Sequence, residues 1–205
     1  MKKRESKIER KTNEVEINGN LVIDGSGELK NIKIKTGFES LDHLLVLFAF
    51  HGFFDLTLEA GGDLTHHILE DIAIVLGDSF KDALGDYSGI RRYGTASVPM
   101  DEVLAKVSVD LGGRHSFVWH DPDGLGKLVK DNLDLTSAEL KKEFLDNLAK
   151  HLGVNLYIEY QTKEGEIDSH HLFEAVFKAL GLALDQASSI EPRRKGVPST
   201  KGIID

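Results

Sequence analysis

Two copies of one five-residue pattern, His-His-x-x-Glu, constrain this chain more than any other feature of its sequence. The first copy spans residues 66–70 and the second spans residues 170–174. Each copy opens a run of apolar residues with helical spacing. A hydroxyl residue, Thr65 or Ser169, precedes each pair of histidines where it can act as the helix N-cap. The pattern therefore predicts two amphipathic helices that each begin with two imidazoles and a carboxylate.

This spacing has a direct chemical meaning. On a helix the glutamate lies four residues after the first histidine and three after the second, so both pairs meet on one surface. The two adjacent histidines point about 100° apart, so one motif can serve two metals, or one metal and a substrate. Imidazole and carboxylate together suit zinc, manganese, iron or nickel. The alternative is two ordinary helix starts, but two copies among nine histidines favour a metal site. Its candidate ligands are His66, His67, Glu70, His170, His171 and Glu174.

The composition restricts the class of protein. Of 205 residues, 40% are hydrophobic and 29% are charged, as in a globular chain with an apolar core. The formal net charge of −9 argues against non-specific binding to nucleic acid or to an anionic membrane. The chain has no cysteine, which excludes disulfides and thiolate metal ligands. Neither a signal-peptide core nor an apolar run of ~20 residues is found, so we expect a cytoplasmic protein.

The first half of the chain alternates between predicted strands and helices. Residues 1–13 are polar and are expected to be loose. The apolar pattern then predicts, in order, strands over residues 15–23 and 32–35, a helix over 41–51 and a strand over 53–60. Asn18-Gly19 and Asp24-Gly25 are turn signals. Ser40 can cap the helix and Gly52 can end it. The first motif helix follows.

The second half repeats this order. The pattern predicts strands over residues 96–98, 103–111 and 115–119, a helix over 136–152, a strand over 154–160 and the second motif helix to about residue 187. A capping box, Thr136-x-x-Glu139, opens the first of these helices and Gly153 ends it. Asp121-Pro122-Asp123-Gly124 is predicted to be a turn, and residues 163–168 a polar loop.

Apart from one additional strand in the second half, both halves are predicted to follow the order strand-strand-helix-strand-helix, with the motif at the start of the last helix. From His66 to His170 the offset is 104 residues, about half the chain. We therefore predict one α+β domain built of two pseudo-repeats, residues 14–90 and 95–187, with a basic tail over residues 190–205. If the helices of one half pack on those of the other, the result is a sheet–helix–helix–sheet arrangement.

An ordered set of short motifs resembles one known family. Asp42-His43 lies upstream of the two His-His-x-x-Glu motifs. The other matching segments, in order, are Arg10-x-Thr12-x-Glu14, Asp24-Gly25-x-Gly27, Thr36-Gly37, residues 89–94, residues 99–102, Gly113-Arg114, residues 174–180 and residues 198–202. The set spans about residues 10–202, nearly the whole chain. It resembles imidazoleglycerol-phosphate dehydratase of histidine biosynthesis, which implies a ribosomal protein S5 domain 2-like fold.

The resemblance implies a reaction and assigns residues to it. The family is a hydro-lyase that removes water from imidazole glycerol phosphate to give imidazole acetol phosphate, with two manganese ions at the imidazole ring. By resemblance the metal ligands are His43, His66, His67, Glu70, His170, His171 and Glu174. Glu14 corresponds to the acid/base group, although a solvated strand residue is the ordinary fate of a glutamate. The substrate phosphate is expected to contact Arg92, Arg114, Ser199 and Lys201. Without the resemblance, His43 reads as a helix-face histidine beside a carboxylate.

The resemblance also implies an assembly of twenty-four chains built from trimers, with metal sites between subunits. Three departures stand against this background. Asp63-Leu64 runs through Thr65 straight into the first motif, where the family has a longer link. Glu39-Ser40 replaces Gly-Phe before the Leu-Asp-His segment. Tyr157 stands where the family has a metal-binding histidine. The departures at Tyr157 and before His66 keep one alternative open, a non-catalytic paralogue of the family. A second alternative, which would use the same metals, is a dinuclear metal hydrolase of phosphate esters.

Overall fold

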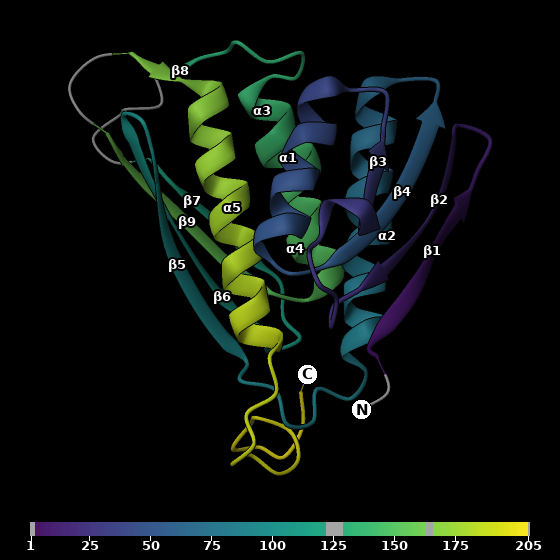
Figure 1. The fold of residues 1–205 in the computed structure, drawn as a ribbon, viewed down its shortest axis with the longest axis vertical. Helices are drawn as coiled ribbons and strands as arrows, with labels where there is room; N and C mark the ends of the chain where they lie inside the picture. Colours follow the sequence, from purple (N-terminus) through teal and green to yellow (C-terminus); the bar gives the residue numbers. More distant parts are fainter. Residues whose placement is uncertain (1–2, 122–128, 163–165, 205) are drawn as a thin grey trace.

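The protein folds into two four-stranded sheets that enclose a double layer of helices (Figure 1). This computed structural model describes residues 3–121, 129–162 and 166–204. The α+β class and the sheet–helix–helix–sheet layers are as predicted. Within the described ranges, no helix has the length and apolar character that a membrane span requires.

The first half forms one sheet and two helices. Its elements are β1 (Glu5–Lys11), β2 (Val15–Val22), β3 (Ile32–Lys35), α1 (Glu39–His51), β4 (Asp55–Gly62) and α2 (Thr65–Leu84), with a 3-10 turn at Leu29–Asn31. The strand order is β1-β2-β4-β3, in which β3 and β4 are parallel and the other pairs antiparallel.

Two predictions for the first sheet were wrong. The region expected to be loose contains the edge strand β1. Only one of its side chains, Ile8, is fully buried, and the charged residues on either side of Ile8 gave no strand pattern. Asn18-Gly19 is not a turn, because it lies inside β2 and pairs with β1 and with β4. Glycine is required there for another reason. A Cβ on Gly19 would lie 2.0 Å from the carbonyl oxygen of Thr57 on β4.

The second half repeats the topology. Its elements are β5 (Tyr93–Met100), β6 (Val103–Asp110), β7 (Ser116–His120), β8 (Val129–Lys130), α3 (Ser137–Glu139), a π-helical stretch (Leu140–Asp146), α4 (Asn147–Leu152), β9 (Asn155–Thr162), β10 (Ile167–Asp168) and α5 (Ser169–Ser188). The strand order β5-β6-β9-β7 matches that of the first sheet, again with one parallel pair, β7 and β9. The short strands β8 and β10 form a separate parallel pair.

The helical predictions of the second half hold at both ends. The capping box between Thr136 and Glu139 is present, and Gly153 ends α4 with φ of 70°. The turn predicted at residues 121–124 lies almost wholly outside the described residues, as do residues 163–165 of the predicted loop. Within the described residues, three strands precede α1 and four strands, β5 to β8, precede α3, so the prediction lacked one strand in each half.

The two halves join through paired helices. In the middle layers α1 packs against α5 and α2 packs against α4. A glycine lies at each crossing, Gly77 on α2 and Gly181 on α5, both eleven residues after the first histidine of a motif. A Cβ on Gly181 would lie 2.4 Å from the carbonyl oxygen of Phe48, and one on Gly77 would lie 2.9 Å from Cβ of His151. Neither helix pair can approach this closely with a larger residue.

Candidate metal centre and anion pocket

The two motif helices begin one residue earlier than the sequence suggested. Thr65 and Ser169 are the first residues of α2 and α5, so their prediction as N-caps was wrong. Leu64 occupies the N-cap position of α2 without a side-chain bond. Asp168 caps α5, and its carboxylate accepts the backbone N–H of His170 at 2.9 Å. An acidic N-cap fits the positive end of the helix dipole.

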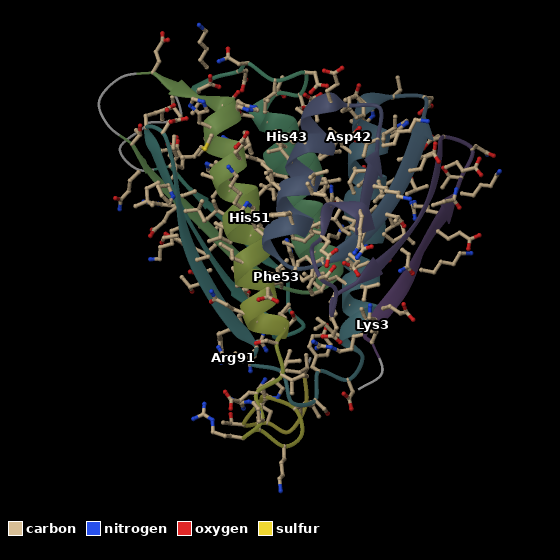
Figure 2. The ribbon with its side chains drawn as sticks, viewed as in Figure 1. Lys3, Asp42, His43, His51, Phe53 and Arg91 are labelled. Carbon is tan, nitrogen blue, oxygen red and sulfur yellow. The ribbon has the colours of Figure 1, made fainter. Side chains whose placement is uncertain are left out.

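The second motif forms a compact group of ligand atoms with a histidine from the other half. Nε2 of His43 on α1 lies 2.8 Å from Oε1 of Glu174, and Nε2 of His170 lies 2.9 Å from the same oxygen. The two imidazole rings stack with centroids 5.6 Å apart. Figure 2 shows His43 near the start of α1. Within the ranges the structure describes, these are the only three or more His, Asp or Glu side chains whose ligand atoms all converge within 4.8 Å.

Glu174 is held in its ionised form although it is 7% exposed. Burial raises the pKa of this carboxyl, but hydrogen bonds from Lys178 and His43 outweigh that effect and hold the pKa below the usual value of a glutamate. Nζ of Lys178, one turn further along α5, lies 2.6 Å from Oε2. One carboxylate oxygen therefore binds an ammonium while the other faces the two imidazoles. This is a suitable donor set for a divalent transition metal, because it combines neutral nitrogen with an anionic oxygen.

The second histidine of each motif is oriented by a carboxylate. Nδ1 of His67 lies 2.8 Å from Oδ1 of Asp63, and Nδ1 of His171 lies 2.9 Å from Oε2 of Glu102. These hydrogen bonds raise the pKa of His67 and the pKa of His171. A carboxylate on Nδ1 fixes the orientation of the ring and leaves Nε2 as the nitrogen that could bind a metal. Oδ2 of Asp101 lies 3.4 Å from Nε2 of His171, so Asp101 and Glu102 both contact this imidazole.

The first motif stays apart from this cluster within one chain. His66 is exposed and Glu70 is half-buried on α2. The His66 and His67 rings lie 4.3 Å apart at an angle of 61°. A single chain therefore brings together three of the seven predicted ligands, His43 from α1 and His170 and Glu174 from α5. The first motif lies apart from them.

Glu14 lies beside the first motif. Its Oε2 is 3.8 Å from Nδ1 of His67, and its side chain is 58% exposed. The turn that carries Glu14 between β1 and β2 is held by Thr12, whose Oγ1 accepts the backbone N–H groups of Glu14 and Val15 at 3.1 and 3.0 Å. The Thr-x-Glu spacing of the sequence therefore has a local structural cause. The carboxylate reaches toward a predicted metal ligand without belonging to the convergent cluster.

The four residues predicted to contact the phosphate line one cavity on another part of the molecule. This cavity of about 250 Å³ is lined by Arg92, Arg114, Ser199 and Lys201, together with neighbouring residues of the tail. The guanidinium of Arg92 binds Asp110 through two bonds of 2.5 and 3.0 Å and donates to the carbonyl of Pro198 at 2.9 Å. Arg92 therefore fixes the tail against β6. A single chain therefore brings all four residues to one cavity.

The candidate metal cluster of His43, His170 and Glu174 and the candidate anion cavity lined by Arg92 and Arg114 lie at opposite ends of α5. His170 is in its first turn, whereas the backbone N–H of Arg92 bonds to the carbonyl of Ala187 in its last. The twenty residues of α5 span about 30 Å at the usual helical rise. The tail below α5 and the start of α1 above it are far apart in Figure 1.

Tyr157 does not belong to the cluster. It is 39% exposed on β9, whose alternate residues Leu156 and Ile158 face the helices, so Tyr157 lies on the outer face of its sheet. Its ring stacks on that of His120, on the parallel neighbour β7, with centroids 6.4 Å apart. His120 is itself exposed.

Sequence reasoning gave no role to several residues that shape the site. Lys178 had a readable signal, because a lysine four residues after a glutamate is the favoured ion pair on a helix. Asp63, four residues before His67, had the same kind of signal. Asn132 and Asp134, which line a cavity beside His43 and His170, had none. They belong to an irregular loop, whose position depends on the packing of both halves.

The comparisons with known proteins agree with this architecture. The family model described as imidazoleglycerol-phosphate dehydratase matches residues 36–184. Proteins of that name from Geobacter metallireducens and Citrifermentans bemidjiense are 46% and 48% identical to this chain, each alignment covering 98% of it and 99% of the relative. A crystal structure of the Pyrococcus furiosus enzyme is 34% identical with a TM-score of 0.76, covering 95% of this chain and 99% of that one. The Staphylococcus aureus enzyme structure is 30% identical with a TM-score of 0.69, covering 91% and 99%. Over nearly its whole length, this chain belongs to the imidazoleglycerol-phosphate dehydratase family.

Proposed function

We propose that this protein removes water from imidazole glycerol phosphate to give imidazole acetol phosphate, a step of histidine biosynthesis. The observation that carries the proposal is the convergence of His43, His170 and Glu174 in a chain whose family is named for this reaction. The test is turnover of the substrate by the purified protein with added Mn²⁺.

The metal sites are proposed to hold two manganese ions per active site. His43, His170 and Glu174 supply one ready set of donors, and the first motif and His171 supply the rest. The donor set of imidazoles and carboxylates suits manganese, because it contains no sulfur ligand. When bound, the metal ions supply positive charge that stabilises the anionic form of the imidazole ring.

Glu14 is proposed to move the proton at the substrate carbon. That carbon is not acidified by a carbonyl group, so a positioned base is needed. The distance of 3.8 Å between Oε2 of Glu14 and Nδ1 of His67 supports the role. His67 is a proposed metal ligand, so the imidazole ring of the substrate would lie next to His67 and near Glu14. The exposed side chain remains accessible to a substrate.

The active site is proposed to combine residues of different subunits. A small phosphorylated imidazole cannot reach from the metal cluster to the anion cavity of the same chain, since α5 separates them by about 30 Å. We therefore infer a homo-oligomer in which the tail of one chain approaches the metal cluster of another. Trimers building a shell of twenty-four chains, as the resemblance implies, would satisfy this requirement.

The anion cavity gives a prediction that isolates phosphate binding. Arg114→Met is expected to weaken binding of the substrate and of inorganic phosphate by tenfold or more, because a charge-assisted contact to phosphate is lost, at roughly 1.5–3 kcal/mol. The effect should appear mainly in KM. Arg91→Met is the matched control, because Arg91 is exposed and does not line the cavity. Equal phosphate affinity in Arg114→Met and the parent would remove Arg114 from the site.

Tyr157 gives a prediction about the metals. A neutral phenol is a poor metal ligand and must lose its proton to bind well, whereas imidazole offers a neutral lone pair. One metal is therefore expected to bind more weakly than its partner, with water where the family has histidine. Tyr157→His should tighten the weaker Mn²⁺ site when both affinities are measured by calorimetry. If neither affinity increases, Tyr157 is either a phenolate ligand already or outside the site.

One alternative has a specific observation in its favour. A catalytically silent paralogue would explain why a tyrosine replaces a ligand histidine and why the link before His66 is short. Such a protein would bind metal and assemble without turnover. The dinuclear phosphate-ester hydrolase would share the metals but would release inorganic phosphate.

A further inference from the structure

Helix α1 begins without a capping side chain of its own. Phe38 occupies its N-cap position and makes no side-chain bond to the first turn. Instead, Oδ1 of Asp134 accepts the backbone N–H of Ser40 at 3.2 Å and also the Ser40 hydroxyl. Ser40 is 8% exposed and lies three residues before His43. Asp134 therefore does from the other half of the chain what an N-cap does locally, and its charge also suits the helix dipole.

The loop that carries Asp134, residues 131–134, is fixed to the start of α5 as well. The backbone N–H of Asn132 donates to Oγ of Ser169 at 2.9 Å. Ser169 is fully buried and immediately precedes His170. Just before the loop, Lys130 on β8 pairs with Asp168 on β10, the residue that caps α5. The 131–134 loop thus bonds to the first turn of both helices that carry the clustered histidines.

The same loop lines a cavity beside the candidate metal cluster. Asn132, Leu133 and Asp134 line a cavity of about 250 Å³ together with His43 and His170. The two histidines come from different halves, so no local stretch of chain sets the distance between them. That distance decides whether both Nε2 atoms reach the one oxygen of Glu174 that they share.

We propose that Asp134 is a positioning residue for the metal centre. By capping α1 against the start of α5, it holds His43 where a metal can bind His43, His170 and Glu174 at once. Asp134 acts through Ser40 and the helix, and not as a ligand. The inference rests on the proposed metal role of the cluster. It also gives a function to one departure from the family pattern, since Ser40 donates both hydrogen bonds to Asp134.

The test compares two aspartates of the same loop with Mn²⁺ as the probe. Asp131 is the matched control, because its Oδ1 accepts the backbone N–H of Ser137, the first residue of α3, at 3.1 Å, and among the described residues it has no bond to α1. Calorimetry on the assembled protein should show that Asp134→Ala weakens Mn²⁺ binding at one site by about tenfold or more, the usual size for loss of a residue that orients a ligand. Asp131→Ala should keep the parental affinity. Asp134→Asn, which retains an acceptor oxygen, should recover most of the loss.

Each outcome decides the inference. Parental Mn²⁺ affinity in Asp134→Ala overturns it, and so does an equal loss in Asp131→Ala, which would indicate general loosening of the loop. If Asp134→Ala fails to assemble, Ser40→Ala carries the test and must weaken binding in the same direction. A parent protein that binds no Mn²⁺ contradicts the proposed function and the inference with it, whereas the other outcomes leave the proposed function intact.

Discussion

Glu14→Gln is expected to reduce the turnover rate by about 10²–10⁴-fold while leaving metal content and assembly unchanged, because general acid/base groups typically contribute that much. The amide keeps the size and the hydrogen-bonding shape of the side chain but cannot exchange a proton at the substrate carbon. Steady-state turnover and elemental analysis on the same preparation separate the two effects.

Glu16→Gln is the matched control for Glu14. Its side chain is also 58% exposed and it lies two residues further along, but its carboxylate binds Lys11 at 3.1 Å on the neighbouring strand. A loss of rate in both variants would point to the local charge of this sheet edge. A near-normal rate in Glu14→Gln would remove this residue from the mechanism.

The double variant His66→Ala/His170→Ala is expected to lose its bound transition metal. The parent should hold about two ions per chain after reconstitution, if imidazole and carboxylate donors of both motifs fill both sites. The variant removes the first imidazole of each motif, so each metal loses a neutral nitrogen ligand. Elemental analysis of the reconstituted assembly measures the difference directly.

Two other histidines provide the control. His115 pairs with Asp146 at 2.7 Å and His151 pairs with Asp78 at 3.2 Å, and neither belongs to a motif. The double variant His115→Ala/His151→Ala should retain the parental metal content. Metal content in His66→Ala/His170→Ala equal to that of the parent would show that the motifs are ordinary helix starts.

The helices and strands could be predicted from the sequence wherever the apolar residues recur with a clear period. Helix α5 and the strands β6 and β9 carry regular buried positions, and the capping box at Thr136 marked a helix start correctly. Strand β1 was missed because only Ile8 is buried within it, and the charged residues around Ile8 look like a solvated segment. The turn predicted at Asn18-Gly19 was wrong because the glycine is required by the close approach of the Thr57 backbone and not by a turn.

The candidate site was readable only in part, for a physical reason. The spacing of His170 and Glu174 on one helix follows from the sequence, and their contact is as predicted. That His43 joins them depends on how α1 crosses α5, which no local pattern encodes. The hydrogen bond by which Asp134 caps α1 joins residues 94 positions apart in the sequence, so no local sequence motif predicts it. The basic residues of the anion cavity were found through the resemblance, because their convergence depends on the fold of the tail.

The measurement that tests the central claim most directly is a two-product assay. The purified, assembled protein is incubated with Mn²⁺ and imidazole glycerol phosphate, and both imidazole acetol phosphate and inorganic phosphate are followed. The account predicts that imidazole acetol phosphate forms and that its formation requires the metal, with no release of phosphate. Release of phosphate in its place, or no product from a fully metal-loaded assembly, would contradict the account.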